Sequence, residues 1–308
     1  NIYKNLSLNL ISNASYRQQN APGTMNSTLD IASGKMSRGF DINPYSYALN
    51  TSRTLDPSVD YISNYAPFNI LHELDNNYIE INMVDVKFQG EMKWKVIQGL
   101  ELSALGAVRY QTSSQGHNVL DDANQAIAYR TGMDDATIRE QNKLLYTDPD
   151  NPYALPITLL PEGGIYQRQD RRMLGLDFRG TLSWNHLFAE KHITNFFAGM
   201  EVNSLQKTYS SFQGWGMQYS MGEIPSYIYQ FFKNGIESGS RYYSLGHSET
   251  RSIASFFNAT YSYDGRYTLN GTFRYEGTNR MGRSRSSRWL PTWNLSGAWN
   301  VHEESFFK

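Results

Sequence analysis

The chain has 308 residues, a net charge of −1 and no cysteine, and 14% of its residues are aromatic. A charge this close to zero argues against nucleic-acid binding, which needs a basic surface. The absence of cysteine excludes a disulfide framework and thiolate zinc sites. No apolar run reaches the roughly 18 residues that a membrane-spanning helix needs.

The first predicted strand alternates apolar and polar residues between Leu6 and Arg17. Such alternation places one kind of side chain on each face of a strand. A polar segment rich in Asn, Ser, Tyr, Gly and Pro follows, from about 18 to 77. A stretch this long without periodicity is unusual in a compact domain, so it predicts a functional loop.

Two strands are predicted between 78 and 110, joined by a short turn at 97–99. The alternation slips near Ile79 and Met83, which predicts a bulge or a change of surroundings. The return strand alternates cleanly and places Arg109 on its polar face.

The next predicted loop, about 111 to 169, contains two helical segments at 121–130 and 134–146. Each opens on an Asp, which suits the positive end of a helix. Carboxylate and amide oxygens that Ca²⁺ prefers follow in a candidate cluster of Asp148, Asp150 and Asn151. Asp and Asn beside Pro are also ordinary turn residues, and that interpretation is favoured, so no metal site is predicted.

Two further strands are predicted at 174–184 and 196–203. Their polar face carries Asp177, Arg179 and Glu201. In a barrel this face lines the lumen, where charges are hydrated or contact a plug. In a soluble sheet it would be the solvent face.

A third long loop, about 209 to 247, is rich in aromatic residues. Aromatic rings stack on sugars and fill pockets for peptide side chains, but they also pack on one another and on a lid, and both interpretations stay open. We expect Trp215→Ala to weaken cargo binding or lid docking without unfolding the barrel. The candidate substrate-binding residues of the loops and the polar face are Trp215, Tyr219, Tyr227, Tyr229, Arg109, Asp177, Arg179 and Glu201.

The clearest strand pattern is a set of three alternating runs in residues 249–301. Asp264 and Gly265 lie between the first two runs, and such a pair predicts a primed hairpin turn with positive φ. The polar face is mostly Ser, Thr, Asn and Gly, and the apolar face is aromatic near its ends. Aromatic girdles, a polar interior and short turns alternating with long loops are typical of a transmembrane β-barrel.

The predicted fold class is therefore all-β, an antiparallel transmembrane β-barrel segment of about eight strands with long extracellular loops. Lipid forbids open sheet edges, so such strands must belong to a closed barrel. A soluble antiparallel β-protein is the alternative.

Three segments, 128–164, 257–280 and 288–306, also carry a family resemblance. The second reads FNATYSYDGRY before RYEGTNR, and the third reads RWLPTW before GAWNVHEESF. Their order and spacing resemble the middle of the barrel in the SusC/RagA family of TonB-dependent outer-membrane transporters of Bacteroidetes.

The resemblance implies a barrel of about 22 strands around an N-terminal plug, in the outer membrane. It also implies active import of oligosaccharides, or of peptides in some members. The implied partners are a SusD-like surface lipoprotein that acts as a lid, TonB pulling on the plug, and outer-membrane lipid. Residues 1–308 would form part of one barrel domain. The plug, the TonB-contacting segment and a signal peptide are expected to lie outside this chain.

No catalytic arrangement is recognised in the sequence. There is no Gly-x-Ser-x-Gly elbow and no Walker-type phosphate loop. The chain is therefore not predicted to be an enzyme or to need a cofactor. Two other functions stay open: a small outer-membrane barrel acting as an adhesin or structural protein, and a soluble β-rich carbohydrate-binding module.

Overall fold

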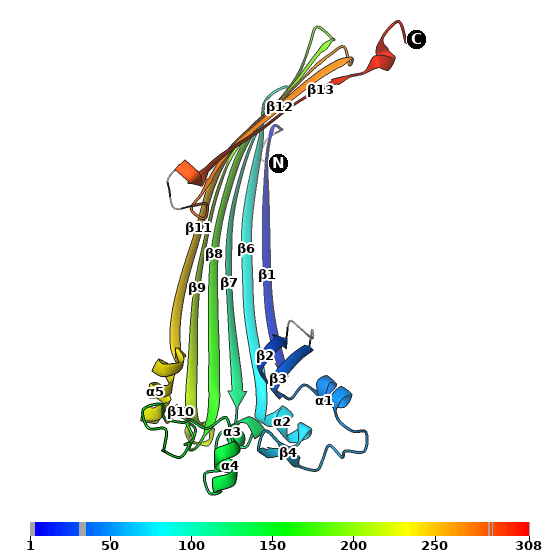
Figure 1. Cartoon of the computed structure of the whole chain (residues 1–308). Helices are drawn as coiled ribbons and strands as arrows, with labels where there is room; N and C mark the ends of the chain where they lie inside the picture. Colours follow the sequence, from blue (N-terminus) through cyan, green and yellow to red (C-terminus); the bar gives the residue numbers. More distant parts are fainter. Residues whose placement is uncertain (1–3, 31–34, 283, 285, 308) are drawn as a thin grey trace.

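The computed structural model describes residues 4–30, 35–282, 284 and 286–307. One long, curved antiparallel sheet dominates it, and the helices gather at one end of the sheet (Figure 1). In spatial order, its long strands are β1 (Leu6–Pro22), β6 (Asn77–Ile97), β7 (Leu100–Val119), β8 (Gly164–Phe188), β9 (His192–Gln218), β11 (Tyr243–Tyr263), β12 (Tyr267–Thr278) and β13 (Trp289–Trp299).

Three long loops hold the smaller elements. The first contains β2 (Thr24–Asp30), β3 (Lys35–Asp41), α1 (Pro44–Asn50), β4 (Tyr61–Ser63), β5 (Ala66–Phe68) and α2 (Ile70–Asn76). The second contains α3 (Asn124–Ala128) and α4 (Ala136–Gln141). The third contains η1 (Tyr219–Met221), β10 (Ile224–Pro225), which pairs with β9, and α5 (Tyr229–Ser238). Two 3₁₀ turns, η2 (Ser286–Arg288) and η3 (Val301–Glu303), flank β13.

Tight turns join the strands at the end opposite the helices (Figure 1). Asp264 and Gly265 have φ angles of 52° and 68°, which confirms the predicted primed turn between β11 and β12. Ala189 and Glu190 adopt the same left-handed pair between β8 and β9, with φ of 48° and 59°. Neither of these two residues is glycine, so this turn carries backbone strain.

The face of the sheet that carries the apolar parity forms continuous cross-strand rows. On β8 the apolar band covers residues 174–184, which matches the ~9–11 residues that a transmembrane strand needs. Phe178 in this band is 46% exposed, as expected of a side chain that faces lipid rather than a core. One row across the sheet contains Leu6, Trp94, Leu102, Leu182, Ala198, Phe257, Phe273 and Trp293.

The opposite face is polar, as predicted. Its rows combine residues such as Ser103, Thr181 and Thr292 with a few charged side chains. In the strand order of the described residues, β1 and β13 each pair with a strand on one side only, so the sheet is an open arc. Among the described residues, no helix is long and apolar enough to cross a membrane.

The conventional hydrophobic core lies among the long loops and the strand ends that they join, away from the apolar band of the sheet. We call residues 40–76, 119–165 and 215–242 the loop cluster. Its largest core contains Val119, Ala123, Ala126, Tyr146, Leu159, Leu160, Ile165 and Trp215. Two smaller cores consist of Phe40, Ala66 and Ala128, and of Ile42, Phe68 and Ile70.

The predicted loop boundaries were wrong, because the strands continue beyond the apolar band. β7 extends to Val119 and β8 begins at Gly164, so the second loop is shorter than 111–169. β9 likewise extends to Gln218, and β11 begins at Tyr243. These extensions lack a regular alternation of apolar and polar residues, and they pair along their backbones with neighbouring strands.

Two local expectations also need correction. The helices at 121–130 and 134–146 are shorter than predicted, and Asp135 caps α4 by accepting from Thr137 N and Ile138 N. No register shift accompanies the slip in alternation near Ile79 and Met83; the shift in β6 lies between Lys95 and Ile97. The slip therefore marks a change of surroundings, where β6 leaves the apolar band and reaches the loop cluster.

Candidate functional site

A chain of alternating charges crosses the polar face of the sheet. Arg179 Nη2 lies 2.7 Å from Glu201 Oε1, and Arg274 Nη2 lies 3.4 Å from the second oxygen of Glu201. Arg274 also binds Glu276 at 2.7 Å. The Glu201 side chain is only 16% exposed, so the two guanidinium groups largely enclose it. This arrangement lines the face with fixed hydrogen-bonding groups that are neutral in sum.

A second ion pair lies nearer the loop cluster on the same face. Arg109 donates from Nε and Nη2 to the two carboxylate oxygens of Asp85, at 3.0 and 2.5 Å. Asp177 shares this face and stands opposite Ala107 and Asn203. All four charged candidates therefore lie on the polar face, as predicted. Their role in substrate binding stays a prediction.

Trp215 is not a surface aromatic residue. It is 7% exposed, and its ring contacts Tyr129 edge-on at 4.9 Å and Phe231 at 5.4 Å between centroids. Phe231 in turn contacts Tyr227 at 5.3 Å. Most of the aromatic residues of the third loop thus pack on one another, which was one of the two open interpretations. Trp215 positions the loop cluster and has little surface for a ligand.

The three tyrosine candidates have different surroundings. The Tyr219 hydroxyl donates to Ile165 O at 3.1 Å, and burial raises the pKa of this hydroxyl. The Tyr227 hydroxyl donates to Gln213 O at 3.0 Å. Tyr229, on α5, is exposed. Tyr219 and Tyr227 therefore tie the loop to strands, and Tyr229 alone presents most of its ring to the outside.

An apolar groove runs beside α5. Its volume is about 530 Å³, and aromatic side chains form much of its wall. α5 lies at the end of the sheet where the other helices gather, next to the end of β11 and beside the lower part of β9 (Figure 1). The groove is lined in part by Leu159, Trp215, Phe231, Phe232, Ile236, Tyr242 and Tyr243.

The acidic cluster in the second loop surrounds a lysine. Lys233 Nζ, from α5, lies 2.5 Å from Asp148 and 2.7 Å from Asp150. Glu237 completes a group of three carboxylates. The Lys233 ammonium lies where a bound cation would lie and offsets part of the negative charge of the three carboxylates. Hydrogen bonds to Asp148 and Asp150 raise the pKa of Lys233, and Lys233 lowers the pKa of Asp148.

Asn151 takes part in this cluster only through its backbone, which donates to Asp148 O at 3.1 Å. The cluster is therefore best understood as a clamp between the second loop and α5. The sequence had offered Asp148, Asp150 and Asn151 as a Ca²⁺ candidate, and Lys233, which is distant in sequence, occupies the position that the ion would take.

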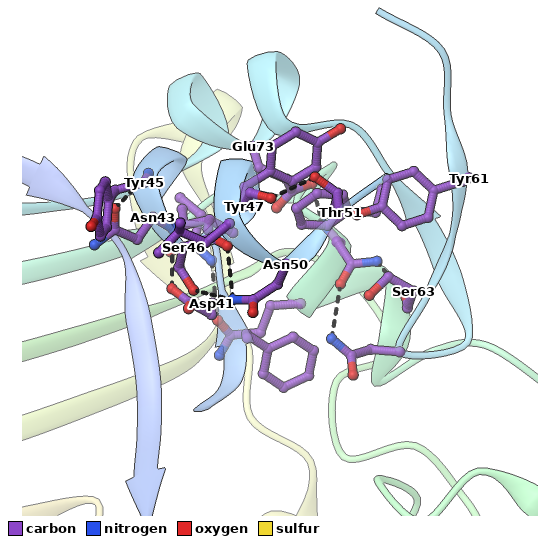
Figure 2. Close-up of a pocket in the computed structure, with 18 residues that line it drawn as sticks. Asp41, Asn43, Tyr45, Ser46, Tyr47, Asn50, Thr51, Tyr61, Ser63 and Glu73 are labelled. Carbon is purple, nitrogen blue, oxygen red and sulfur yellow. Dashed lines mark hydrogen bonds between the residues drawn. The ribbon is translucent and has the colours of Figure 1, made fainter. Parts of the chain in front are cut away.

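A polar pocket of about 700 Å³ lies in the first loop, between α1, β4 and α2 (Figure 2). Glu73 lines it and is 1% exposed. Its Oε1 accepts from Asn124 N at 2.7 Å, and Asn124 Nδ2 donates to Ser63 O at 2.7 Å and Ala66 O at 3.0 Å. Burial raises the pKa of the Glu73 carboxyl to about 7.

A buried histidine continues this network towards the sheet. His117 Nε2 lies 2.6 Å from Asn77 Oδ1, and Asn77 donates to Gln125 at 3.2 Å. Burial lowers the pKa of His117 to about 4. A Cβ at Gly23 would lie 1.8 Å from Asn77 Oδ1, so this glycine is required for the close approach of the chain to the network.

Sequence reasoning missed Glu73, although a signal was present. Asn69 caps α2 by accepting from Leu71 N and His72 N, which fixes the start of the helix. Ile70, Glu73 and Asn77 then follow at helical spacing on one face. An apolar residue and a carboxylate on the same face predict a buried charge.

No known family model matches the chain, and no curated protein matches it. Solved structures do. The RagAB peptide importer in the 'closed-closed' state aligns over 100% of this chain and 30% of its own, with a TM-score of 0.61 and 13% identity. The same importer in the 'open-open' state aligns over 98% and 29%, with a TM-score of 0.58 and 13% identity. The RagAB peptide transporter aligns over 79% and 22%, with a TM-score of 0.52 and 14% identity.

These similarities confirm the predicted fold class. The chain is a mostly antiparallel β segment whose arrangement matches part of a RagAB transporter chain. It spans 30% or less of the RagAB chains that it matches. At 13–14% identity the similarity shows the fold alone, so activity, cargo and partners are proposals.

Proposed function

We propose that the chain forms part of the barrel of an outer-membrane importer for oligopeptides or oligosaccharides, of the SusC/RagA kind. One observation carries the proposal. The sheet has continuous apolar rows on one face, a polar opposite face and a packed loop cluster at one end. The whole chain aligns with part of a peptide importer.

The polar face suits a polar cargo. Its ion pairs leave no large net charge, and Ser, Thr and Asn supply donors and acceptors along the rows. Peptides and oligosaccharides both present many such groups. Arg109, Asp177, Arg179 and Glu201 are the proposed contacts for cargo. The role is transport and not catalysis, with energy supplied through a plug and TonB as the family resemblance implies.

Within the loop cluster, α5 and the groove beside it are the proposed docking surface for a surface lipoprotein that acts as a lid. Ile236 on α5 is 83% exposed beside the apolar groove, and Tyr229 is exposed on the same helix. Exposed apolar side chains around a groove are typical of a surface that a protein partner covers.

The test is recovery of the protein from native outer membranes in mild detergent, followed by intact-mass analysis. We expect a polypeptide far larger than 308 residues, together with a lipoprotein. A lone protein of about this length would contradict the proposal and favour a small adhesin or structural barrel. A protein that stays in solution without detergent would favour a soluble carbohydrate-binding module.

A matched pair of variants separates the docking surface from the barrel. Ile236→Asp places a charge beside the groove, and we expect it to abolish recovery of the lipoprotein. Leu49→Asp changes an equally apolar, exposed residue on α1, away from the groove, and recovery should stay normal. Equal recovery with both variants would remove α5 from the proposal.

A further inference from the structure

The pocket between α1, β4 and α2 contains two buried polar atoms that lack a hydrogen-bond partner in the described structure, Tyr47 Oη and Glu73 Oε2. A buried polar group without a partner costs about 1–3 kcal/mol, and more when it is charged. Native proteins therefore leave few of them. Two such atoms among the residues that line one pocket mark a place where a bound molecule, a ligand or an ordered water, would supply the missing partners.

The side chains around these atoms favour a cation. Asp41 and Glu73 both line the pocket, and no Lys, Arg or His is found among the described lining residues. Aromatic rings form part of the wall, with Phe68 stacked on Tyr47 at 6.3 Å and beside Tyr61 at 5.3 Å. Acidic groups and aromatic faces together attract a positively charged ligand group.

The geometry of Glu73 narrows the choice of cation. Its Oε1 is already occupied by Asn124 N, so only one carboxylate oxygen is free. A guanidinium group binds carboxylates best through both oxygens, whereas an ammonium group is a compact point charge that needs only one. Ca²⁺ takes six to eight oxygen ligands. The described residues place no third His or acidic ligand atom with this carboxylate in the way they do around Lys233.

We propose that this pocket binds a primary ammonium group of a small organic amine or a peptide, held by Glu73 Oε2 and Tyr47 Oη. A hydroxyl ligand could satisfy the same two atoms, but it would leave the buried carboxylate without a counter-charge. The site lies in the loop cluster, away from the polar face of the sheet. It therefore does not depend on the proposed transport function.

The first test compares two probes of nearly equal shape, benzylammonium and benzyl alcohol. Their binding to the full-length protein in detergent is measured by titration calorimetry at pH 8. We expect the amine to bind at least tenfold more tightly than the alcohol. Equal affinities, or no amine binding at all, would overturn the proposal.

Two variants locate the site. Glu73→Gln keeps the Oε1 acceptor for Asn124 and the shape of the side chain, but removes the charge. We expect it to weaken amine binding at least tenfold and to leave the alcohol unchanged. Tyr47→Phe should weaken amine binding severalfold, and Tyr229→Phe, on the far helix α5, should have no effect. Unchanged amine binding in Glu73→Gln would overturn the proposal, whatever the other variants do.

A pH series adds an independent readout. The groups that surround Glu73 are His72 on its own helix, Asp60 before β4, and the pocket residues Asp41, Tyr47 and Tyr61. Because the Glu73 pKa is about 7 without a ligand, amine binding should strengthen from pH 5.5 to pH 8 and take place with proton release below pH 7. A flat profile over this range would contradict the role of Glu73.

Discussion

The transmembrane part of the sheet and the loop cluster treat their apolar side chains in opposite ways. In the sheet, large residues such as Phe178 and Phe273 lie exposed on the apolar face. Ala107 and Ala254, which are buried at the same level of the sheet, are small and lie on the polar face. In the loop cluster, Leu160 and Ile165 are fully enclosed, as in a water-soluble domain.

The difference shows that the two regions are stabilised by different solvents. In the proposed outer-membrane setting, lipid takes the place of a core for the sheet, whose strands are held by continuous backbone pairing. Water surrounds the loop cluster, which must bury its own apolar surface to stay folded. The loss of stability that a substitution causes should therefore depend on whether the position faces lipid or lies in the core of the loop cluster.

The largest effect is expected from Trp215→Ala, which removes a buried aromatic side chain from the main core of the loop cluster. Such a truncation costs about 3–5 kcal/mol. Native-state hydrogen exchange should show easier opening of the loop cluster, with the sheet amides unchanged. Tyr229→Ala, at an exposed position, is the control and should stay within about 0.5 kcal/mol of the parent protein. Similar exchange in both variants would contradict the burial of Trp215.

The next effect is expected in the sheet. Phe178→Arg places a charge on the lipid face and should cost about 2–4 kcal/mol of unfolding free energy. Thr181→Arg places the same residue on the polar face of the same strand and should cost much less. Urea unfolding of the full-length protein from phospholipid vesicles measures both. Equal losses would mean that the two faces have been assigned wrongly.

A smaller effect should appear with pH in the loop cluster. The Glu73 pKa is raised from 4.5 to about 7, so its contribution is complete below pH 4.5 and is lost as pH rises through 7. The loss is about 2–3 kcal/mol, since one pKa unit is about 1.4 kcal/mol and the nearby pocket lets some water in. The difference in hydrogen exchange between the parent protein and Glu73→Gln from pH 5 to pH 8 measures it, because that comparison separates the contribution of Glu73 from that of other titrating groups.

His117 should act in the opposite direction. It lies beyond the apolar band of β7, and its pKa is lowered from 6.5 to about 4. Its contribution is therefore present above pH 6.5 and is lost as pH falls through 4. Between about pH 4.5 and 6.5 the two contributions change in opposite directions and largely cancel, so the loop cluster should have a shallow stability maximum near pH 5 to 6. A monotonic pH profile in the parent protein would contradict this pairing.

The smallest effect is expected from Lys233→Met. The variant leaves Asp148, Asp150 and Glu237 close together without a counter-charge, so α5 should exchange its amides faster. The effect should be largest at low salt, because mobile ions screen exposed carboxylates. Lys143→Met, at an exposed lysine of the second loop, is the control. No difference between the two at low salt would show that the clamp is energetically neutral.

What depended on short-range rules could be predicted from the sequence. Period-two alternation placed Arg179 and Glu201 on one face, because that placement needs only the strand geometry. The turn at Asp264 and Gly265 followed from the need for positive φ. Both were confirmed because neither depends on distant contacts.

What depended on contacts between loops could not be predicted. The burial of Trp215 comes from Tyr129, and the environment of Glu73 comes from Asn124. The loop boundaries were wrong for a related reason. Beyond the apolar band, β8 pairs along its backbone without an alternation of apolar and polar residues, so residues 164–169 were assigned to a loop.

The extension of β8 beyond its apolar band determines how far the loop cluster lies from that band. From Gly164 to Leu174 the strand covers roughly 33 Å at ~3.3 Å per residue. At a tilt of about 40° that length raises the loop cluster by about 25 Å. If the chain lies in the outer membrane as proposed, antibodies, phage and proteases outside an intact cell would meet a raised, folded head, whose epitopes are conformational and vanish with the packing around Trp215.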